Sequence, residues 1–146
     1  MGYNGLRKSW IFPGQASQFV GMGKDLFDST DVGKKYYNLA NDILEVDIQD
    51  ISFNGPEEKL KITKYTQPAI FIVSSVISHL LIENGHVPGC VAGHSLGEYS
   101  ALTAAGGISF ETGLELVKIR SNSMDKAGIT NPGTMAAIIA VSYTHL

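Results

Sequence analysis

A serine between two glycines constrains the fold of this chain most strongly: residues 93–97 read Gly-His-Ser-Leu-Gly. An apolar stretch at 87–92 precedes them, and the small-residue segment EYSALTAAG follows. A turn this sharp between a strand and a helix leaves no space for a Cβ on either side of the serine, which explains both glycines. The serine hydroxyl then lies at a helix N-terminus, where negative charge is stabilised. The pattern predicts that Ser95 is a nucleophile, with the N–H of Leu96 as an oxyanion donor.

The same serine has a plainer structural interpretation. A serine at the start of a helix can cap it, and Glu98, three residues later, would complete a capping box. The strand expected before Ser95 and the helix expected after it favour the nucleophile.

The rest of the pattern predicts short strands that alternate with helices, which favours a parallel α/β sheet. We expect strands at 9–12, 87–92 and 135–141, and helices at 31–44, 67–81, 98–106 and from 110 to about 126. Pro68 suits the first turn of its helix, and Ser109 is placed to cap the last one. In a parallel sheet, the turn at Pro13 and Gly14 would lie at the same edge as the Ser95 turn.

Composition excludes several classes of protein. The chain has 146 residues and a formal net charge of -3, without a basic stretch that could follow a phosphate backbone, so we expect no nucleic acid partner. No run approaches the roughly 18 to 20 apolar residues of a membrane span, and we expect a cytoplasmic protein that binds no membrane. The single cysteine, Cys90, excludes an internal disulfide, and its apolar neighbours predict a buried strand residue.

Four motifs in order resemble those of the malonyl-CoA:acyl carrier protein transacylases. GHSLGEYSAL resembles the family's nucleophile motif, and FPGQASQ at 12–18, followed by a GMG at 21–23, resembles its FPGQGSQ motif, from which only Ala16 departs. ITKYTQPAI at 62–70 resembles the family's TxxTQPAI element, and Arg120 in KIRSNSM corresponds to its arginine. The resemblance runs from about residue 9 to residue 140.

The resemblance implies a parallel-sheet, hydrolase-like acyltransferase core of the α/β class. Residues 1–133 would be the N-terminal part of that core, and 134–140 the first strand of a truncated, ferredoxin-like inserted subdomain. The last six residues, VSYTHL, match the translation of a common sequencing adaptor, so we expect that 141–146 are not native. The chain is thus expected to be an N-terminal fragment.

The resemblance also implies a role for each site residue. Ser95 would carry a malonyl ester during transfer from malonyl-CoA to the phosphopantetheine thiol of acyl carrier protein, in fatty acid biosynthesis. The backbone amides of Gln15 and Leu96 would form the oxyanion hole, and Arg120 would bind the free malonyl carboxylate in substrate binding. Neither a cofactor nor a metal is implied. Without the resemblance, Gln15 could equally be a polar loop residue and Arg120 a solvated helix residue.

A serine nucleophile needs a base, and histidine is the usual one. His94 adjoins Ser95, but neighbouring side chains diverge at such a turn, and packing or exposure explains His79 and His86. His145 lies in no matching motif. The resemblance places the base beyond residue 146, so we expect the chain as given to be inactive.

Three other functions stay open at this stage. A polyketide-type synthase could use the same motifs in an acyltransferase domain. An esterase of the α/β-hydrolase type would give the acyl group to water. A non-catalytic acyl-binding module would keep the fold without the base.

Overall fold

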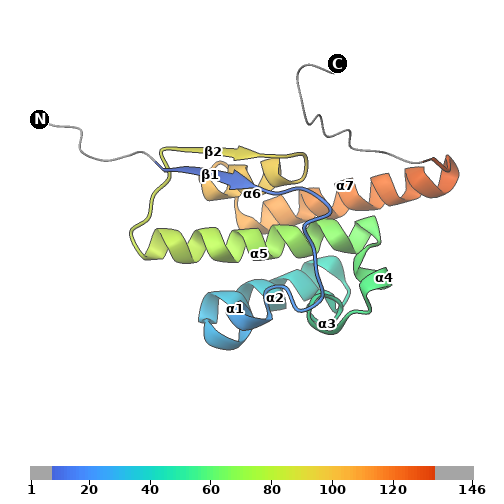
Figure 1. Cartoon of the computed structure of the whole chain (residues 1–146), viewed down its shortest axis with the longest axis horizontal. Helices are drawn as coiled ribbons and strands as arrows, with labels where there is room; N and C mark the ends of the chain where they lie inside the picture. Colours follow the sequence, from blue (N-terminus) through green and yellow to red (C-terminus); the bar gives the residue numbers. More distant parts are fainter. Residues whose placement is uncertain (1–7, 134–146) are drawn as a thin grey trace, which may run out of the picture.

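The computed structural model describes residues 8–133, which form two strands and seven helices, five of the helices between the two strands and two after the second. They are β1 (Ser9–Phe12), α1 (Lys24–Ser29), α2 (Asp31–Leu44), α3 (Ile48–Asn54), α4 (Glu57–Leu60), α5 (Thr63–Glu83), β2 (Cys90–Gly93), α6 (Gly97–Ala104) and α7 (Phe110–Thr130). Figure 1 shows α5 lying between the sheet on one side and α1, α2 and α3 on the other.

The sheet confirms the predicted parallel arrangement. β1 and β2 pair in parallel, with Ser9 opposite Cys90 and Phe12 opposite Gly93. Both strands therefore end at the same edge, where the N–H of His94 donates to the carbonyl oxygen of Phe12 at 3.0 Å. The turn after β1 and the Ser95 turn meet there, as the sequence predicts.

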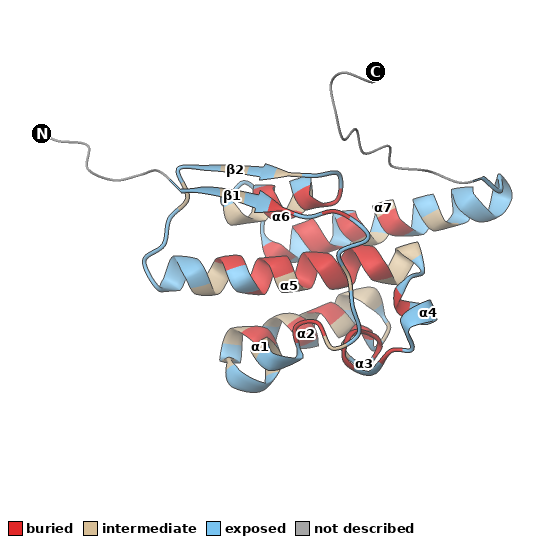
Figure 2. Ribbon diagram, viewed as in Figure 1, coloured by how far each residue is buried: buried red, intermediate tan, exposed pale blue. Residues whose placement is uncertain are grey.

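Helix α5 forms the centre of the core. It packs against α7 and also contacts α2, α3, α4 and α6, and Figure 2 shows much of its middle part coloured as buried. By length and composition alone, α5 could cross a membrane, which corrects the expectation that no segment approaches such a span. However, 61% of its 18-residue apolar window is buried against the rest of the protein. Its apolar character is explained by its place in the core.

The helix boundaries differ most from the prediction at the start of α5 and at the end of α7. α5 begins at Thr63 rather than at residue 67, so Pro68 lies in its second turn and not its first. The earlier start is supported by Thr66, whose hydroxyl donates to the carbonyl oxygen of Leu60 at 2.5 Å. α7 begins as predicted, with the Ser109 side chain accepting from the N–H of Thr112, but continues to Thr130.

Cys90 corrects another expectation, because its side chain is exposed rather than buried. It is the first residue of β2, and its thiol donates across the strand pair to the Ser9 hydroxyl at 3.0 Å. Within residues 8–133 the sheet has two strands, so neither strand has the second neighbour that a buried central strand would have. The strand predicted at 135–141, the subdomain at 134–140 and the tail at 141–146 lie outside the described residues.

The junction of α1 and α2 depends on a close backbone approach at Gly33. Thr30 ends α1 and caps α2: its hydroxyl donates to the Leu26 carbonyl oxygen at 2.7 Å and accepts from the Gly33 N–H at 2.9 Å. A Cβ on Gly33 would collide with the backbone of Leu26 and Phe27. Glycine is therefore required here although it lies inside a helix.

We expect Gly33→Ala to destabilise the protein by about 1–3 kcal/mol, because the new methyl group would force α1 and α2 apart. The matched control is Gly128→Ala in α7, which is exposed and has no atom near the added Cβ. There the better helix propensity of alanine should stabilise the protein by about 0.5–1 kcal/mol. Urea unfolding followed by circular dichroism measures both, and a stabilising effect at position 33 would contradict the packing argument.

Candidate active site

Ser95 lies in a strained turn between β2 and α6, as its motif predicts. Its φ of 54° falls in the left-handed region, which residues other than glycine rarely adopt. A Cβ on Gly93 would collide with the backbone of Gly97, and one on Gly97 with the carbonyl of Phe12. The turn therefore packs against the end of β1. Both flanking residues must be glycine, because a Cβ at either position would collide with backbone atoms.

Arg120 is the hydrogen-bond partner of the Ser95 side chain. Its Nη2 donates to Ser95 Oγ at 2.8 Å, although the two residues are 25 positions apart in the sequence. No side chain caps α6, so the capping box with Glu98 is not formed. The guanidinium also lies over the ring of Tyr99, with Cζ 5.9 Å from the ring centroid. A fixed positive charge thus lies beside the candidate nucleophile.

Gln67 joins Arg120 to the turn after β1. Its Oε1 accepts from Arg120 Nη1 at 2.6 Å, and its Nε2 lies 3.4 Å from Gln15 Oε1. Gln15 in turn donates from Nε2 to Thr63 Oγ1 at 3.3 Å. The sequence prediction gave no role to Gln67, although it lies in the TQPAI segment that carried part of the resemblance. The sequence feature that could have pointed to Gln67 is a polar residue at the start of the apolar segment 67–81.

The backbone amides predicted for an oxyanion hole lie at the same edge of the sheet. Gln15 follows the Pro13–Gly14 turn, and Leu96 precedes the first residue of α6. Neither the N–H of Gln15 nor that of Leu96 donates to another residue within 8–133. Both N–H groups thus lack an acceptor in this part of the chain, and of the two residues Gln15 is exposed whereas Leu96 is buried.

The described histidines do not bond to the Ser95 hydroxyl. His79 on α5 accepts or donates through Nδ1 at 3.0 Å from the Tyr36 hydroxyl, and its Nε2 lies 3.2 Å from Glu83. Burial, with Glu111 and Glu83 nearby, raises the pKa of Tyr36. His79 thus has the packing role expected for it.

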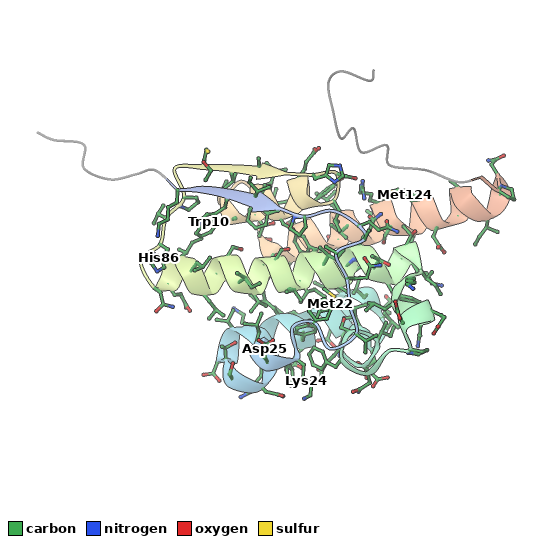
Figure 3. The ribbon with its side chains drawn as sticks, in the orientation of Figure 1. Trp10, Met22, Lys24, Asp25, His86 and Met124 are labelled. Atoms are coloured by element: carbon green, nitrogen blue, oxygen red, sulfur yellow. The ribbon has the colours of Figure 1, made fainter. Side chains whose placement is uncertain are left out.

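The side chains of His94 and His86 likewise make no hydrogen bond to Ser95 Oγ, whose side-chain partner is Arg120. The His94 ring lies against Gly14, and His86 is exposed in the loop between α5 and β2, at the end of the molecule that also holds Trp10 (Figure 3). His145 lies outside the described residues. Within 8–133, no group of three or more His, Cys, Asp or Glu side chains could hold a metal ion.

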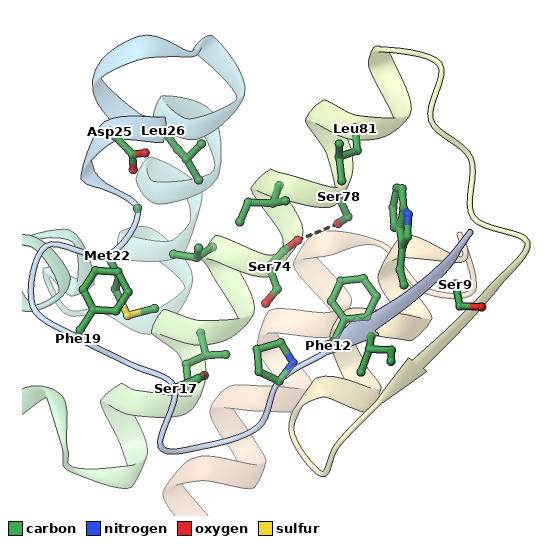
Figure 4. Close-up of a pocket in the computed structure, with 17 residues that line it drawn as sticks. Ser9, Phe12, Ser17, Phe19, Met22, Asp25, Leu26, Ser74, Ser78 and Leu81 are labelled. Atoms are coloured by element: carbon green, nitrogen blue, oxygen red, sulfur yellow. Dashed lines mark hydrogen bonds between the residues drawn. The ribbon is translucent and has the colours of Figure 1, made fainter. Parts of the chain in front are cut away.

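A hollow of about 640 Å³ lies elsewhere, between β1, α1 and α5. Figure 4 shows Phe12, Phe19, Met22 and Leu81 among its walls, with the Ser78 hydroxyl bonded to the Ser74 carbonyl oxygen. Neither Ser95 nor Arg120 lines it. It is therefore separate from the candidate active site.

Ala16 is strained in the turn that carries Gln15. Its φ of 85° lies in the region that favours glycine, and it is the position at which the motif FPGQASQ departs from FPGQGSQ. The left-handed conformation costs a residue with a Cβ about 1–2 kcal/mol. The Ala16 N–H bonds to Gln18 Oε1 at 2.9 Å, which helps to hold this turn.

Ala16→Gly should stabilise the protein by roughly 1 kcal/mol, because it removes that conformational cost. Ala105→Gly is the matched control: residue 105 is also exposed but has a φ of -78°, so glycine should destabilise there by about 0.5–1 kcal/mol. Thermal and urea unfolding of the two variants check the opposite signs. Destabilisation by Ala16→Gly would mean that the turn is not strained.

Comparison with known proteins places the site in a family. The family model described as acyl transferase domain matches residues 9–145. A malonyl CoA-acyl carrier protein transacylase of Synechocystis sp. is 45% identical over 141 residues, which is 97% of this chain and 46% of the relative. The chain therefore spans less than half the length of this relative.

Solved structures agree in fold and sequence. The crystal structure of Synechocystis sp. malonyl-CoA:ACP transacylase superposes with a TM-score of 0.80 at 47% identity, covering 84% of this chain and 41% of that one. A type II PKS acyl-carrier protein in complex with its malonyl-transacylase gives a TM-score of 0.78 at 41% identity, covering 84% and 40%. On its motifs, its parallel strand pair and these matches, the chain belongs to the acyl transferase domain family, and it is similar to malonyl-CoA:acyl carrier protein transacylases within it.

Proposed function

We propose that the protein of which this chain is part transfers a malonyl group from coenzyme A to acyl carrier protein through an ester on Ser95. In the first step Ser95 Oγ bonds to the thioester carbon, the carbon–sulfur bond breaks, and the serine proton passes to the coenzyme A thiolate. In the second step the carrier thiol attacks the ester, its proton returns to Ser95 Oγ, and malonyl carrier protein leaves. Neither step needs a cofactor.

The observation that carries this proposal is the 2.8 Å bond between Arg120 Nη2 and Ser95 Oγ. Arginine has five N–H donors, of which two are used here, by Ser95 and Gln67. The remaining donors can bind the free carboxylate of a short dicarboxylic acyl group attached to Ser95. An uncharged acyl group would leave the guanidinium unpaired, so the arrangement favours malonyl over acetyl.

The amides of Gln15 and Leu96 would bind the carbonyl oxygen during each attack. Both lie where the parallel strands end, and both lack an acceptor among the described residues. Such donors stabilise the negative charge of a tetrahedral intermediate. Because Arg120 bonds to a lone pair of Ser95 Oγ, the hydroxyl proton stays available to a base. We expect that base to be a residue outside 8–133.

A polyketide pathway is the second candidate, because one matching structure is that of a type II PKS carrier protein with its malonyl-transacylase. The reaction on Ser95 would be the same, and only the carrier protein would differ. We favour fatty acid biosynthesis and a cytoplasmic location, on the basis of the transacylase matches.

Arg120→Ala in the full-length protein should lower kcat/KM for malonyl-CoA by roughly 100-fold, since a charge-assisted, bidentate pair with the carboxylate is lost. Transfer of acetyl should fall less than about threefold, because acetyl has no carboxylate. Arg120→Lys, which keeps the charge but not the planar fork, should fall between the two. Steady-state kinetics with both thioesters measures the ratio. Equal losses on both substrates would overturn the assignment of Arg120.

Mass spectrometry of the full-length protein with malonyl-CoA should find a malonyl adduct on Ser95, and none in Ser95→Ala. Added acyl carrier protein should discharge the adduct far faster than water does. Rapid discharge by water would instead indicate an esterase, and the absence of an adduct would indicate an acyl-binding module.

A further inference from the structure

Gln67 is a buried amide at the centre of the polar contacts around Arg120. It lies on α5 with 1% of its surface exposed, among the apolar residues that form the core of the protein. A buried amide without partners is costly, so its oxygen and its nitrogen both need hydrogen bonds. Here the oxygen bonds to Arg120, and the nitrogen contacts Gln15 Oε1 and Met124 Sδ, each at 3.4 Å.

These contacts join three segments that are far apart in the sequence. Gln15 lies in the turn after β1, Gln67 in α5 and Arg120 in α7. Met124, labelled in Figure 3, lies one turn further along α7 than Arg120. A single side chain thus links the turn of the proposed oxyanion hole to the helix that carries the proposed carboxylate ligand.

The orientation of each amide in this chain of contacts is set by Arg120. A guanidinium can only donate, so the group of Gln67 that faces it at 2.6 Å must be the oxygen. The Gln67 nitrogen must then point toward Gln15, whose oxygen accepts and whose nitrogen donates to Thr63 Oγ1. The direction of each hydrogen bond, from Arg120 through Gln67 and Gln15 to Thr63, therefore follows from one charged group.

Arg120 needs such support because its side chain is long and only half-buried. Ser95 Oγ binds Nη2, and Tyr99 lies beneath the guanidinium, but Gln67 is the partner with the shortest contact and the deepest burial. A buried neighbour on a core helix fixes a ligand group more firmly than an exposed one does. Loss of Gln67 would let the guanidinium leave the position in which it can meet an acyl carboxylate.

We propose that Gln67 is a positioning residue that sets the acyl preference of the site by holding the Arg120 guanidinium beside Ser95 and tying it to the Gln15 turn. This inference rests on the proposed function, because it assumes that Arg120 binds the malonyl carboxylate. Gln67 itself touches Arg120 and not the reacting atoms.

The test is Gln67→Met in the full-length protein, which keeps the length of the side chain but removes both hydrogen-bonding groups. kcat/KM for malonyl-CoA should fall by about 10-fold, the effect of losing one hydrogen bond to a charged group, and mainly through a higher KM. Acetyl-CoA should change by less than about threefold. Ser78→Ala, another buried polar position on α5, is the matched control and should leave both substrates within about twofold. Equal losses on both substrates in Gln67→Met would overturn the proposal.

The same measurement in the Arg120→Ala background distinguishes a failure of the role of Gln67 from a failure of the role of Arg120. If Gln67 acts through Arg120, Gln67→Met should not change the malonyl-to-acetyl ratio further in that background. A further fall of about 10-fold would show that Gln67 acts independently and would overturn the inference alone. If Arg120→Ala by itself leaves the ratio unchanged, the proposed role of Arg120 fails, and that of Gln67 with it.

Gln67→Glu covers the case in which Gln67→Met does not fold. It keeps the oxygen that faces Arg120, but its carboxylate would pair with the guanidinium and compete with the malonyl carboxylate. The malonyl-to-acetyl ratio should again fall by about 10-fold. An unchanged ratio would overturn the proposal.

Discussion

The contact between the Ser95 turn and the end of β1 determines how the rest of the site is arranged. Gly97 lies so close to the Phe12 carbonyl that no Cβ fits between them, and the N–H of His94 bonds to the same carbonyl oxygen at 3.0 Å. A turn near residue 95 is thereby fixed against a strand near residue 12. Once that contact exists, the Gln15 turn and the N-terminus of α6 must lie side by side, whichever side chains they carry.

The polar part of the site is assembled on the apolar core rather than at the surface. α5 is held by α7 on one side and by α2 and α3 on the other, so a side chain that it buries has a well-defined position. Gln67 uses that position to bond to Arg120 on α7. The packing that buries α5 therefore also places the guanidinium of Arg120, because it fixes the side chain of Gln67.

Local signals made much of this arrangement predictable from the sequence. The two glycines around Ser95 predicted the sharp turn, the N-cap at Ser109 predicted the start of α7, and the apolar run at 9–12 predicted β1. The parallel pairing followed from the alternation of strands and helices. Each of these features depends on neighbours within a few residues or on the general rules of α/β folds.

Features that depend on distant contacts were predicted less well. Cys90 was expected to be buried because of its apolar neighbours, but burial depends on whether other elements cover its strand. The early start of α5 depends on the bond from Thr66 to the Leu60 carbonyl, which no periodicity reveals. The role of Gln67 was missed for the same reason, since its partner lies 53 residues away on another helix.

The position of Arg120 also suggests how such a site can reject acyl groups as well as accept them. The guanidinium contacts Ser95 Oγ, Gln67 Oε1 and the ring of Tyr99, and all three of these groups are neutral. On the proposed function, a malonyl ester would supply the missing negative charge, whereas an acetyl ester would displace water from the guanidinium without replacing it. A charge left unpaired in this way is a repulsive element of specificity. Selectivity would then depend on how firmly Gln67 prevents the guanidinium from turning toward solvent.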